Sequence, residues 1–131
     1  MRKVIGEGKF DKILNTHYSQ GIRVNNLVFV AGQLPVDDQF QIVSLGDVAG
    51  QARKVFENMK DVLEEAGATM QDVVSVEIYL RNIRHLPVIA PARREYFSPN
   101  KPIATLVEVN ALVHPDALVE VSAIAIIDEP S

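Results

Sequence analysis

The stretch GDVAGQARKVFENMKDVLEEAGATMQDVVSVEIYL, residues 46–80, decides the fold because its hydrophobic periodicity changes halfway along. In the first half, apolar side chains recur at spacings of three and four, as on one buried face of a helix. These residues are Val48, Ala52, Val55, Met59, Val62, Leu63 and Ala66. Asp47 can cap the free N–H groups at the start, and Gly67 can adopt the left-handed conformation that ends a helix. We therefore predict a helix over residues 47–66.

The second half of this stretch alternates instead. In VVSVEIYL, residues 73–80, the apolar side chains of one parity are Val74, Val76, Ile78 and Leu80. The other parity carries Ser75, Glu77 and Tyr79, so this segment is typical of a half-buried strand.

Working outward, the sequence predicts five further elements. IRVNNLVFVAGQL, residues 22–34, places an Asn-Asn pair between two short apolar runs, which indicates a hairpin of two strands. A second helix covers much of 85–97, and its start stays open because Pro87 and Pro91 cannot both lie in a first turn. The last two predicted strands are 103–109 and 117–127. A loop that contains His114, Pro115 and Asp116 separates them.

This order of strands and helices indicates an α/β fold: a mixed β-sheet with two helices on one face. The last strand shows that the other face also needs cover. One parity carries Ala117, Val119, Val121, Ala123, Ala125 and Ile127, while the other carries Leu118, Glu120, Ser122, Ile124 and Ile126. Because both sides of this strand are mainly apolar, we expect a partner subunit to bury the helix-free face.

Composition limits the classes of function. The 131 residues are the length of a single domain, 1–131, and they contain no cysteine. The net charge is -4 and the thirteen Lys and Arg residues are scattered, which disfavours nucleic-acid binding. No apolar run approaches the roughly 18 to 20 residues that span a bilayer. We therefore expect a cytoplasmic protein that binds neither nucleic acid nor membrane.

Few residues point to chemistry on sequence grounds alone. His17, His85 and His114 lack the spacing of metal ligands, so ordinary loop roles are favoured and we expect no metal site. Glu120 differs because it is a carboxylate in the middle of an apolar strand. Such a group needs hydrogen-bond donors, and burial would raise its pKa toward that of a general acid. The same pattern also fits a structural ion pair at a subunit interface. Glu108 has the parity of Ala104 and Leu106, and we expect it to face the same interface as Glu120.

Several segments together resemble the Rid (YjgF, RidA-like) family of imine and enamine deaminases. HYSQGIRVNNLVFVAGQLPVD, residues 17–37, is similar to the opening of that family, and residues 46–83 are similar to its helix-and-strand block. HPDALVEVSAIAI, residues 114–126, resembles its last strand. The resemblance implies a chorismate-mutase-like fold, a homotrimer around a central barrel, and clefts between subunits. It also implies hydrolysis of a reactive imine or enamine to a carbonyl product and ammonia, without cofactor or metal.

The resemblance also implies site residues. The site tyrosine of the family falls on Tyr18, its glutamate on Glu120 and the glycine of its hairpin edge on Gly32. We expect Glu120 and Tyr18 to be catalytic, with hydrogen bonds to Glu120 from Tyr18 or from the hairpin edge. The expected substrate-binding positions are Ala31, Gly32, Ala104 and Leu106. Ala104 stands where the family carries an arginine that pairs with the substrate carboxylate, and alanine cannot replace those two charge-assisted hydrogen bonds.

Three functions follow from these observations. The first is an enzyme that hydrolyses an imine or enamine of atypical structure. The second is a non-catalytic trimer that binds a small metabolite in the same clefts. A ribonuclease, an activity attributed to this family, ranks third because the chain is acidic.

Overall fold

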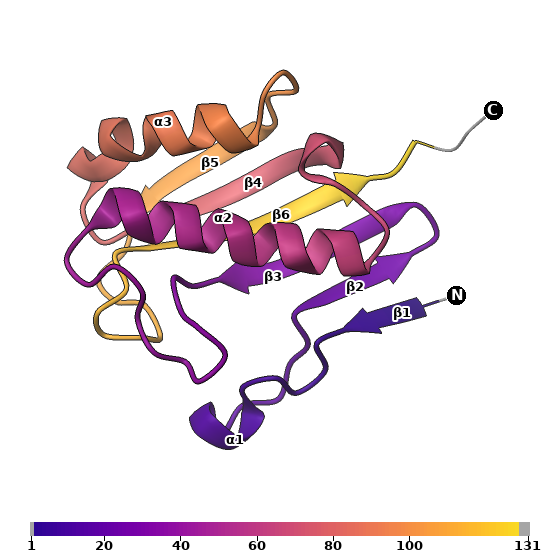
Figure 1. Ribbon diagram of the computed structural model, residues 1–131, viewed down its shortest axis with the longest axis horizontal. Helices are drawn as coiled ribbons and strands as arrows, with labels where there is room; N and C mark the ends of the chain where they lie inside the picture. Colours follow the sequence, from indigo (N-terminus) through magenta and orange to yellow (C-terminus); the bar gives the residue numbers. More distant parts are fainter. Residues whose placement is uncertain (1, 129–131) are drawn as a thin grey trace.

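The computed structural model describes residues 2–128 and contains one six-stranded sheet in the order β1-β2-β3-β6-β4-β5 (Figure 1). Its strands are β1 (Arg2–Ile5), β2 (Gly21–Val24), β3 (Leu27–Gln33), β4 (Val73–Leu80), β5 (Ile103–Glu108) and β6 (Val119–Ile126). The helices are α1 (Asp11–Leu14), α2 (Val48–Glu65) and α3 (Leu86–Tyr96), with short 3-10 turns η1 (Met70–Asp72) and η2 (Ile83–His85).

The prediction of α2 is confirmed together with both of its ends. An Asp47 carboxylate oxygen accepts a hydrogen bond from the Gly50 N–H at 3.1 Å, which satisfies a donor that the first turn leaves free. Gly67, just after the helix, has a φ of +91°, a conformation that side chains disfavour. Val55, Met59 and Leu63 on the predicted apolar face are fully buried against the sheet.

The early hairpin is confirmed as well, and it is part of a longer meander. β2 and β3 pair in antiparallel register across Asn25 and Asn26, and Asn25 has a φ of 55°, as such a tight turn requires. The strand β1 was not predicted. Three of its four residues are exposed, so it lacks the alternation that would mark a strand and is held by its pairing with β2.

The start of the second helix is settled by its two prolines. α3 begins at Leu86, so Pro87 lies in the first turn, where a missing N–H costs nothing. Pro91 lies inside the helix. Its missing hydrogen bond would have gone to the carbonyl of Pro87, four residues earlier. The start at Leu86 therefore accommodates Pro87, whereas Pro91 interrupts the hydrogen bonding inside the helix.

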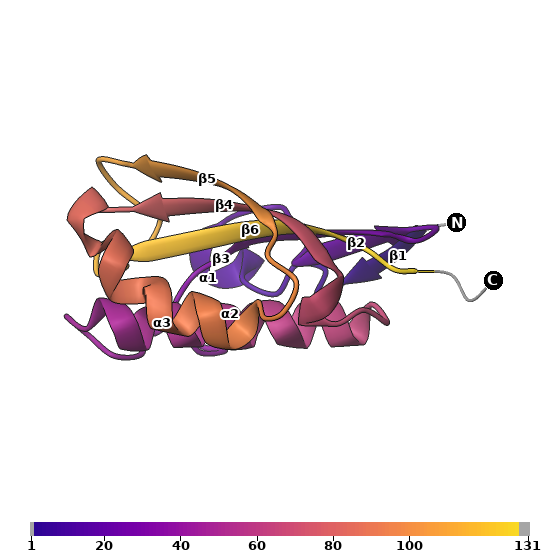
Figure 2. The ribbon, with the colours of Figure 1, turned by 90° about the horizontal axis from the view of Figure 1, so that it is seen from above.

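The sheet is mixed, as predicted. β4 and β5 are parallel, and every other neighbouring pair is antiparallel. The last strand, β6, lies between β3 and β4, so the strand at the end of the chain fills the centre of the sheet (Figure 1). Seen edge-on, α2 and α3 both lie on one side of this sheet (Figure 2).

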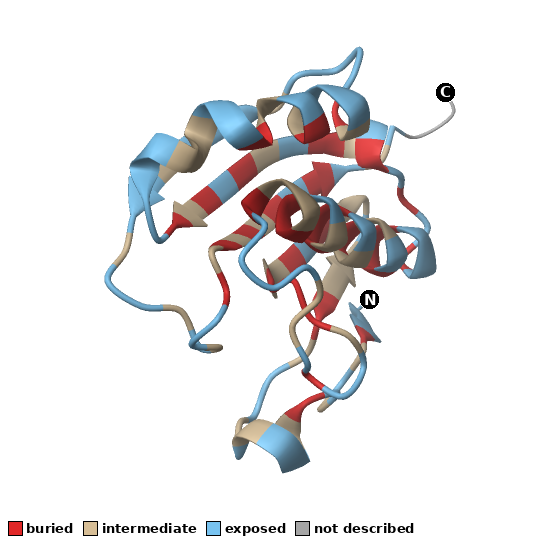
Figure 3. Cartoon of the chain, turned by 60° about the vertical axis from the view of Figure 1, so that its left-hand side comes forward, coloured by how far each residue is buried: buried red, intermediate tan, exposed pale blue. Residues whose placement is uncertain are grey.

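The two faces of the sheet differ in how far their side chains are buried. On the helix-covered face of β6, Val119 and Val121 are fully buried, and the alternation along the strands is visible in Figure 3. The opposite face exposes Phe29, Val107, Ile124 and Ile126, each with 37 to 43% of its surface accessible.

One detail of β4 was predicted wrongly. Val74 is exposed and Val73 is buried, although Val74 shares a parity with the buried residues Val76 and Ile78. The pairing with β6 shifts between Val73 and Ser75. Such a bulge exchanges the faces of the residues that precede it, and periodicity alone does not reveal it.

Candidate functional site

The candidate site begins with an irregularity in β3. Val30 pairs with Ala123 of β6 and Gln33 pairs with Val121, so two residues, Ala31 and Gly32, stand opposite one. A bulge of this kind brings the backbone closer to its neighbour and often lies beside a functional group. Here that group is Glu120. A Cβ placed on Gly32 would overlap the Glu120 Oε2 and lie 2.9 Å from its Cδ, so only glycine leaves room for this carboxylate.

Glu120 is a half-buried carboxylate on the helix-free face of the sheet. Burial raises the pKa of its carboxyl group. The hydrogen bonds that we expected from Tyr18 or from the hairpin edge are absent: within residues 2–128, its carboxylate has no hydrogen-bond or ion-pair partner. A carboxyl group in this state readily holds a proton and can transfer it to a bound molecule.

Tyr18 lies in the segment before β2 and is 37% exposed. Burial is the main cause that raises the pKa of its hydroxyl, and the negative charge of Glu120 raises it further. The nearby Gln20 side chain lowers the pKa of Tyr18 and so partly offsets these effects. Tyr18 is therefore within electrostatic reach of Glu120, and its hydroxyl remains a donor at neutral pH.

Two buried amides behind Tyr18 and Gly32 were missed by sequence reasoning. The Gln33 Nε2 donates to the Gln20 Oε1 at 3.1 Å and to the Ala31 carbonyl at 3.0 Å. The Gln20 side chain is buried, and its Nε2 has no hydrogen-bond partner among the described residues. The only signal in the sequence was a glutamine at the end of the apolar run LVFVAGQ. These amides fix the loop that carries Tyr18 to the bulge that carries Gly32.

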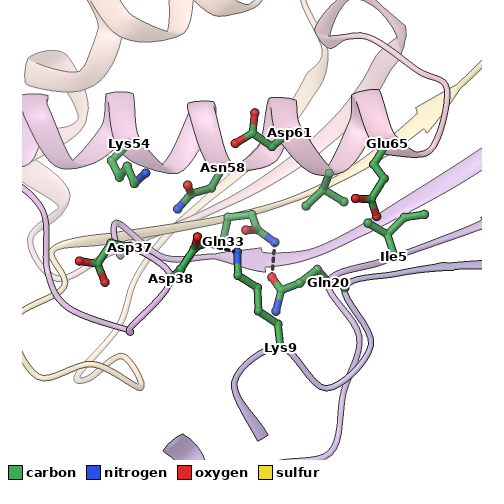
Figure 4. Close-up of a pocket in the computed structure, with 12 residues that line it drawn as sticks. Ile5, Lys9, Gln20, Gln33, Asp37, Asp38, Lys54, Asn58, Asp61 and Glu65 are labelled. Atoms are coloured by element: carbon green, nitrogen blue, oxygen red, sulfur yellow. Dashed lines mark hydrogen bonds and ion pairs between the residues drawn. The ribbon is translucent and has the colours of Figure 1, made fainter.

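The same pair of amides also borders a hollow under α2 (Figure 4). This hollow has a volume of about 360 Å³ and is lined by both acidic and basic side chains, including a Lys9–Asp38 ion pair of 3.1 Å. Neither Tyr18 nor Glu120 lines it. The hollow is thus separate from the candidate catalytic groups.

The remaining expected site residues lie elsewhere in the chain. Ala104 and Leu106 of β5 pair with Val76 and Ile78, whose side chains are buried on the helix-covered face. Since register partners share a face, Ala104 and Leu106 point away from the face of Glu120. β4 also separates β5 from β6. Within one chain, the fold brings together Glu120, Gly32 and Tyr18 but not Ala104 and Leu106.

The expectation for Glu108 was wrong. Its register partner is Leu80 on the helix-covered side of β4, not a residue on the face of Glu120. Its Oε1 accepts a hydrogen bond from the Ile83 N–H at 3.0 Å. Glu108 therefore holds the turn after β4, and strand parity could not show this because parity does not say how separate strands align.

Residues 2–128 contain no cluster of three or more His, Cys, Asp or Glu side chains that could hold a metal ion. His114 has a local role, since its Nδ1 accepts a hydrogen bond from the Asp116 N–H at 3.1 Å. Among the described helices, none is both long and apolar enough to cross a membrane.

Comparison with known proteins identifies the class of protein that this fold and site define. Residues 11–127 match the family model described as Endoribonuclease L-PSP. A RutC family protein of Pyrococcus abyssi is 44% identical over 108 residues, which are 82% of this chain and 84% of that protein. The 3-aminoacrylate deaminase RutC of Acinetobacter baylyi is 38% identical over 108 residues, covering 82% of this chain and 85% of that protein.

A solved structure agrees with these relatives. The crystal structure of a YjgF family member from Mycobacterium tuberculosis has a TM-score of 0.81 and 31% sequence identity, covering 97% of this chain and 100% of that one. The chain belongs to the Rid (YjgF) family.

Proposed function

We propose that this chain forms a chorismate-mutase-like homotrimer with a central barrel and hydrolyses a reactive imine or enamine in clefts between its subunits. The observation that carries the proposal is Glu120, a half-buried carboxyl group of raised pKa that lies against Gly32. The relative named 3-aminoacrylate deaminase supports this reaction class, because 3-aminoacrylate is an enamine. The products are a carbonyl compound and ammonia.

The geometry supports a simple division of roles. Protonated Glu120 gives its proton to the substrate nitrogen, or to the carbon of an enamine, which yields an electrophilic iminium carbon. Water attacks that carbon while the Glu120 carboxylate accepts a proton from it. This proton then returns to nitrogen and ammonia leaves, while the Glu120 carboxylate takes the proton of the new hydroxyl; this yields the carbonyl and restores protonated Glu120. The Tyr18 hydroxyl orients the water or the nitrogen by hydrogen bonding. No step requires a metal or an organic cofactor.

A trimer would complete both the fold and the site. The apolar helix-free face, with Phe29, Ile124 and Ile126, is the surface that a neighbouring subunit would cover. Because Ala104 and Leu106 face away from Glu120 in one chain, β5 of one subunit would have to meet Glu120 of another. Light scattering at micromolar concentration should give three times the 14.5 kDa chain mass. A monomer mass would contradict the proposal.

The substrate is expected to be atypical for the family. An arginine at position 104 would bind a carboxylate next to the imine carbon, and Ala104 offers no charge there. Loss of one partner of a buried charge pair costs about 2 to 5 kcal/mol, or roughly 30-fold to several thousand-fold in rate. Small 2-imino acids should therefore react slowly.

The decisive experiment removes the acid. An amino-acid oxidase generates imines in a coupled assay, and keto-acid release is measured with and without the protein. Glu120→Gln should keep the oligomeric mass and lower turnover by about 100-fold or more. Glu64→Gln is the matched control because Glu64 is an exposed residue of α2. The turnover of this variant should equal that of the wild type. Equal turnover in both variants would refute a catalytic role for Glu120.

A complementary variant tests the role of position 104. Ala104→Arg should raise turnover of small 2-imino acids by about 10-fold or more if the rest of the cleft is intact. No gain would favour the second candidate, a non-catalytic trimer that binds a small metabolite. The second candidate is kept because Ala104 offers no charge for a substrate carboxylate. The acidic charge of the chain continues to disfavour a ribonuclease.

A further inference from the structure

A second hollow lies between α3 and the segment that leads into β5, and its chemistry differs from that of the hollow under α2. It has a volume of about 330 Å³, which is at the lower end of the range for small-molecule pockets. Part of its lining is apolar and includes Val76, Ala90 and Pro102. Its charged lining residues are Arg93, Arg94 and Lys101. All three are cationic, and no acidic side chain lines the hollow.

Arg93 is the central charge of this hollow because it is half-buried and uncompensated. Burial lowers the pKa of its guanidinium, and no neighbouring anion offsets that effect. Within residues 2–128, its side chain has no ion-pair or hydrogen-bond partner. The only carboxylate of α3, Glu95, pairs with Arg53 of α2 instead. A half-buried cation beside two other cations is unfavourable unless an anion binds it.

The other internal arginine provides a contrast. The Arg23 Nη1 donates to the Ala66 carbonyl at 2.9 Å, and its Nε donates to the Asn25 carbonyl at 2.8 Å. The Arg23 side chain therefore has a structural role at the end of α2. Arg93 has no comparable partner, so its donors remain available to a ligand.

The position of the hollow connects it to the missing arginine. Ala104 is the register partner of Val76, which lines the hollow, and it follows the lining residue Pro102 by two positions. Ala104 and Val76 therefore lie side by side on the helix-covered face. β5 has no positive charge at position 104, but Val76, the register partner of Ala104, lines the same hollow as Arg93 of α3.

From this arrangement we infer that the hollow binds the carboxylate of a ligand through Arg93, with the apolar body of that ligand lying along Val76 and Pro102. The planar guanidinium matches a carboxylate with two parallel hydrogen bonds, and Arg94 and Lys101 add positive charge. For catalysis the inference rests on the proposed function. It then defines the substrate class as imines or enamines in which a short apolar chain separates the carboxylate from the carbon that reacts at Glu120 of a neighbouring subunit.

The binding test uses hexanoate, with hexanol as its uncharged counterpart, and follows the backbone amide resonances of the intact protein. Hexanoate should shift resonances of α3 and of the start of β5, and hexanol should bind at least about 10-fold more weakly. Arg93→Met keeps most of the apolar stem and removes the charge, so it should weaken hexanoate binding by about 10- to 100-fold. Arg84→Met is the control, because Arg84 is exposed and does not line the hollow.

Three results would overturn this inference. Equal loss of hexanoate binding in Arg93→Met and Arg84→Met would overturn it, and so would equal affinity for hexanoate and hexanol. Hexanoate shifts confined to other elements would also overturn it. Binding is measured without turnover, so these results do not depend on whether Glu120 is catalytic.

A kinetic arm then addresses the substrate class. In the coupled assay, Arg93→Met should lower turnover of an imine with a distant carboxylate by about 10-fold or more and leave that of an uncharged imine unchanged. An equal loss on both imines would contradict the role in specificity. Loss of all turnover in Glu120→Gln, with hexanoate binding intact, would separate the two roles.

Discussion

The two faces of the sheet show how this chain separates stability from chemistry. On the helix-covered face, Val119 and Val121 are fully buried among apolar neighbours, and one chain is enough to bury them. On the other face, Glu120 is half-buried without a hydrogen-bond partner among the described residues, and Ile124, four residues further along β6, is 37% exposed. Adjacent residues of one strand thus belong to two different environments. The first environment is complete within one chain, and the second is left partly open to solvent.

The largest expected effect concerns the complete face. Ile78 on β4 is fully buried beneath the helices. Ile78→Ala should lower the free energy of unfolding by about 2 to 5 kcal/mol, because it removes apolar contacts and leaves a cavity. Chemical denaturation at two protein concentrations measures this loss. The loss should be the same at both concentrations, and a concentration-dependent loss would mean that Ile78 acts through association instead.

The next effect concerns the incomplete face. Ile124→Asp places a charge on the exposed apolar surface and should weaken self-association by roughly 30-fold or more, since a charge without a partner is costly to bury. The far-ultraviolet circular dichroism of the chain should stay unchanged. Sedimentation at several concentrations measures the oligomer, and Lys60→Gln on α2, which also lowers the net charge by one, serves as the control. An unaltered oligomer in Ile124→Asp would place the interface elsewhere.

A smaller effect is expected at the bulge. Gly32→Ala forces its new Cβ into the space of the Glu120 carboxylate. The carboxylate must then move, and turnover should fall by about 10-fold. The oligomeric mass and the melting temperature should change little, which separates this effect from unfolding. Full activity in a correctly folded Gly32→Ala would show that the position of this carboxylate does not matter for the reaction.

The smallest effect is a pH dependence of stability. The folded state raises the pKa of Glu120, so it binds this proton more tightly than the unfolded chain does. Wild-type stability therefore falls as pH rises from the unfolded pKa to the folded pKa. Glu120→Gln has no carboxyl group to titrate at this position. At pH values above that interval, its melting temperature should exceed that of the wild type by about 1 to 3 °C. The difference should shrink toward lower pH, and a difference that grows instead would reverse the assigned sign.

The sequence was a good guide wherever the relevant contacts are close along the chain. The apolar spacing of α2 and its caps at Asp47 and Gly67 were read correctly because helix hydrogen bonds join residues four apart. The Asn25 turn was also read correctly, for the same reason. Errors occurred where alignment between distant strands decides the result. Val74 and Glu108 were assigned to the wrong faces because parity within one strand says nothing of bulges or of the neighbouring register.

For the candidate site, the sequence by itself determined which residue types are present and that Glu120 is unusual among apolar neighbours. It also determined that position 104 is an alanine, which offers no charge to a ligand. Only the tertiary structure decided that Glu120 lies against Gly32 and that the uncompensated Arg93 lies near Ala104. The physical reason is that helix spacing and strand alternation are local. The insertion of β6 between β3 and β4, and the packing of α3 beside β5, depend on how the whole chain buries its apolar surface.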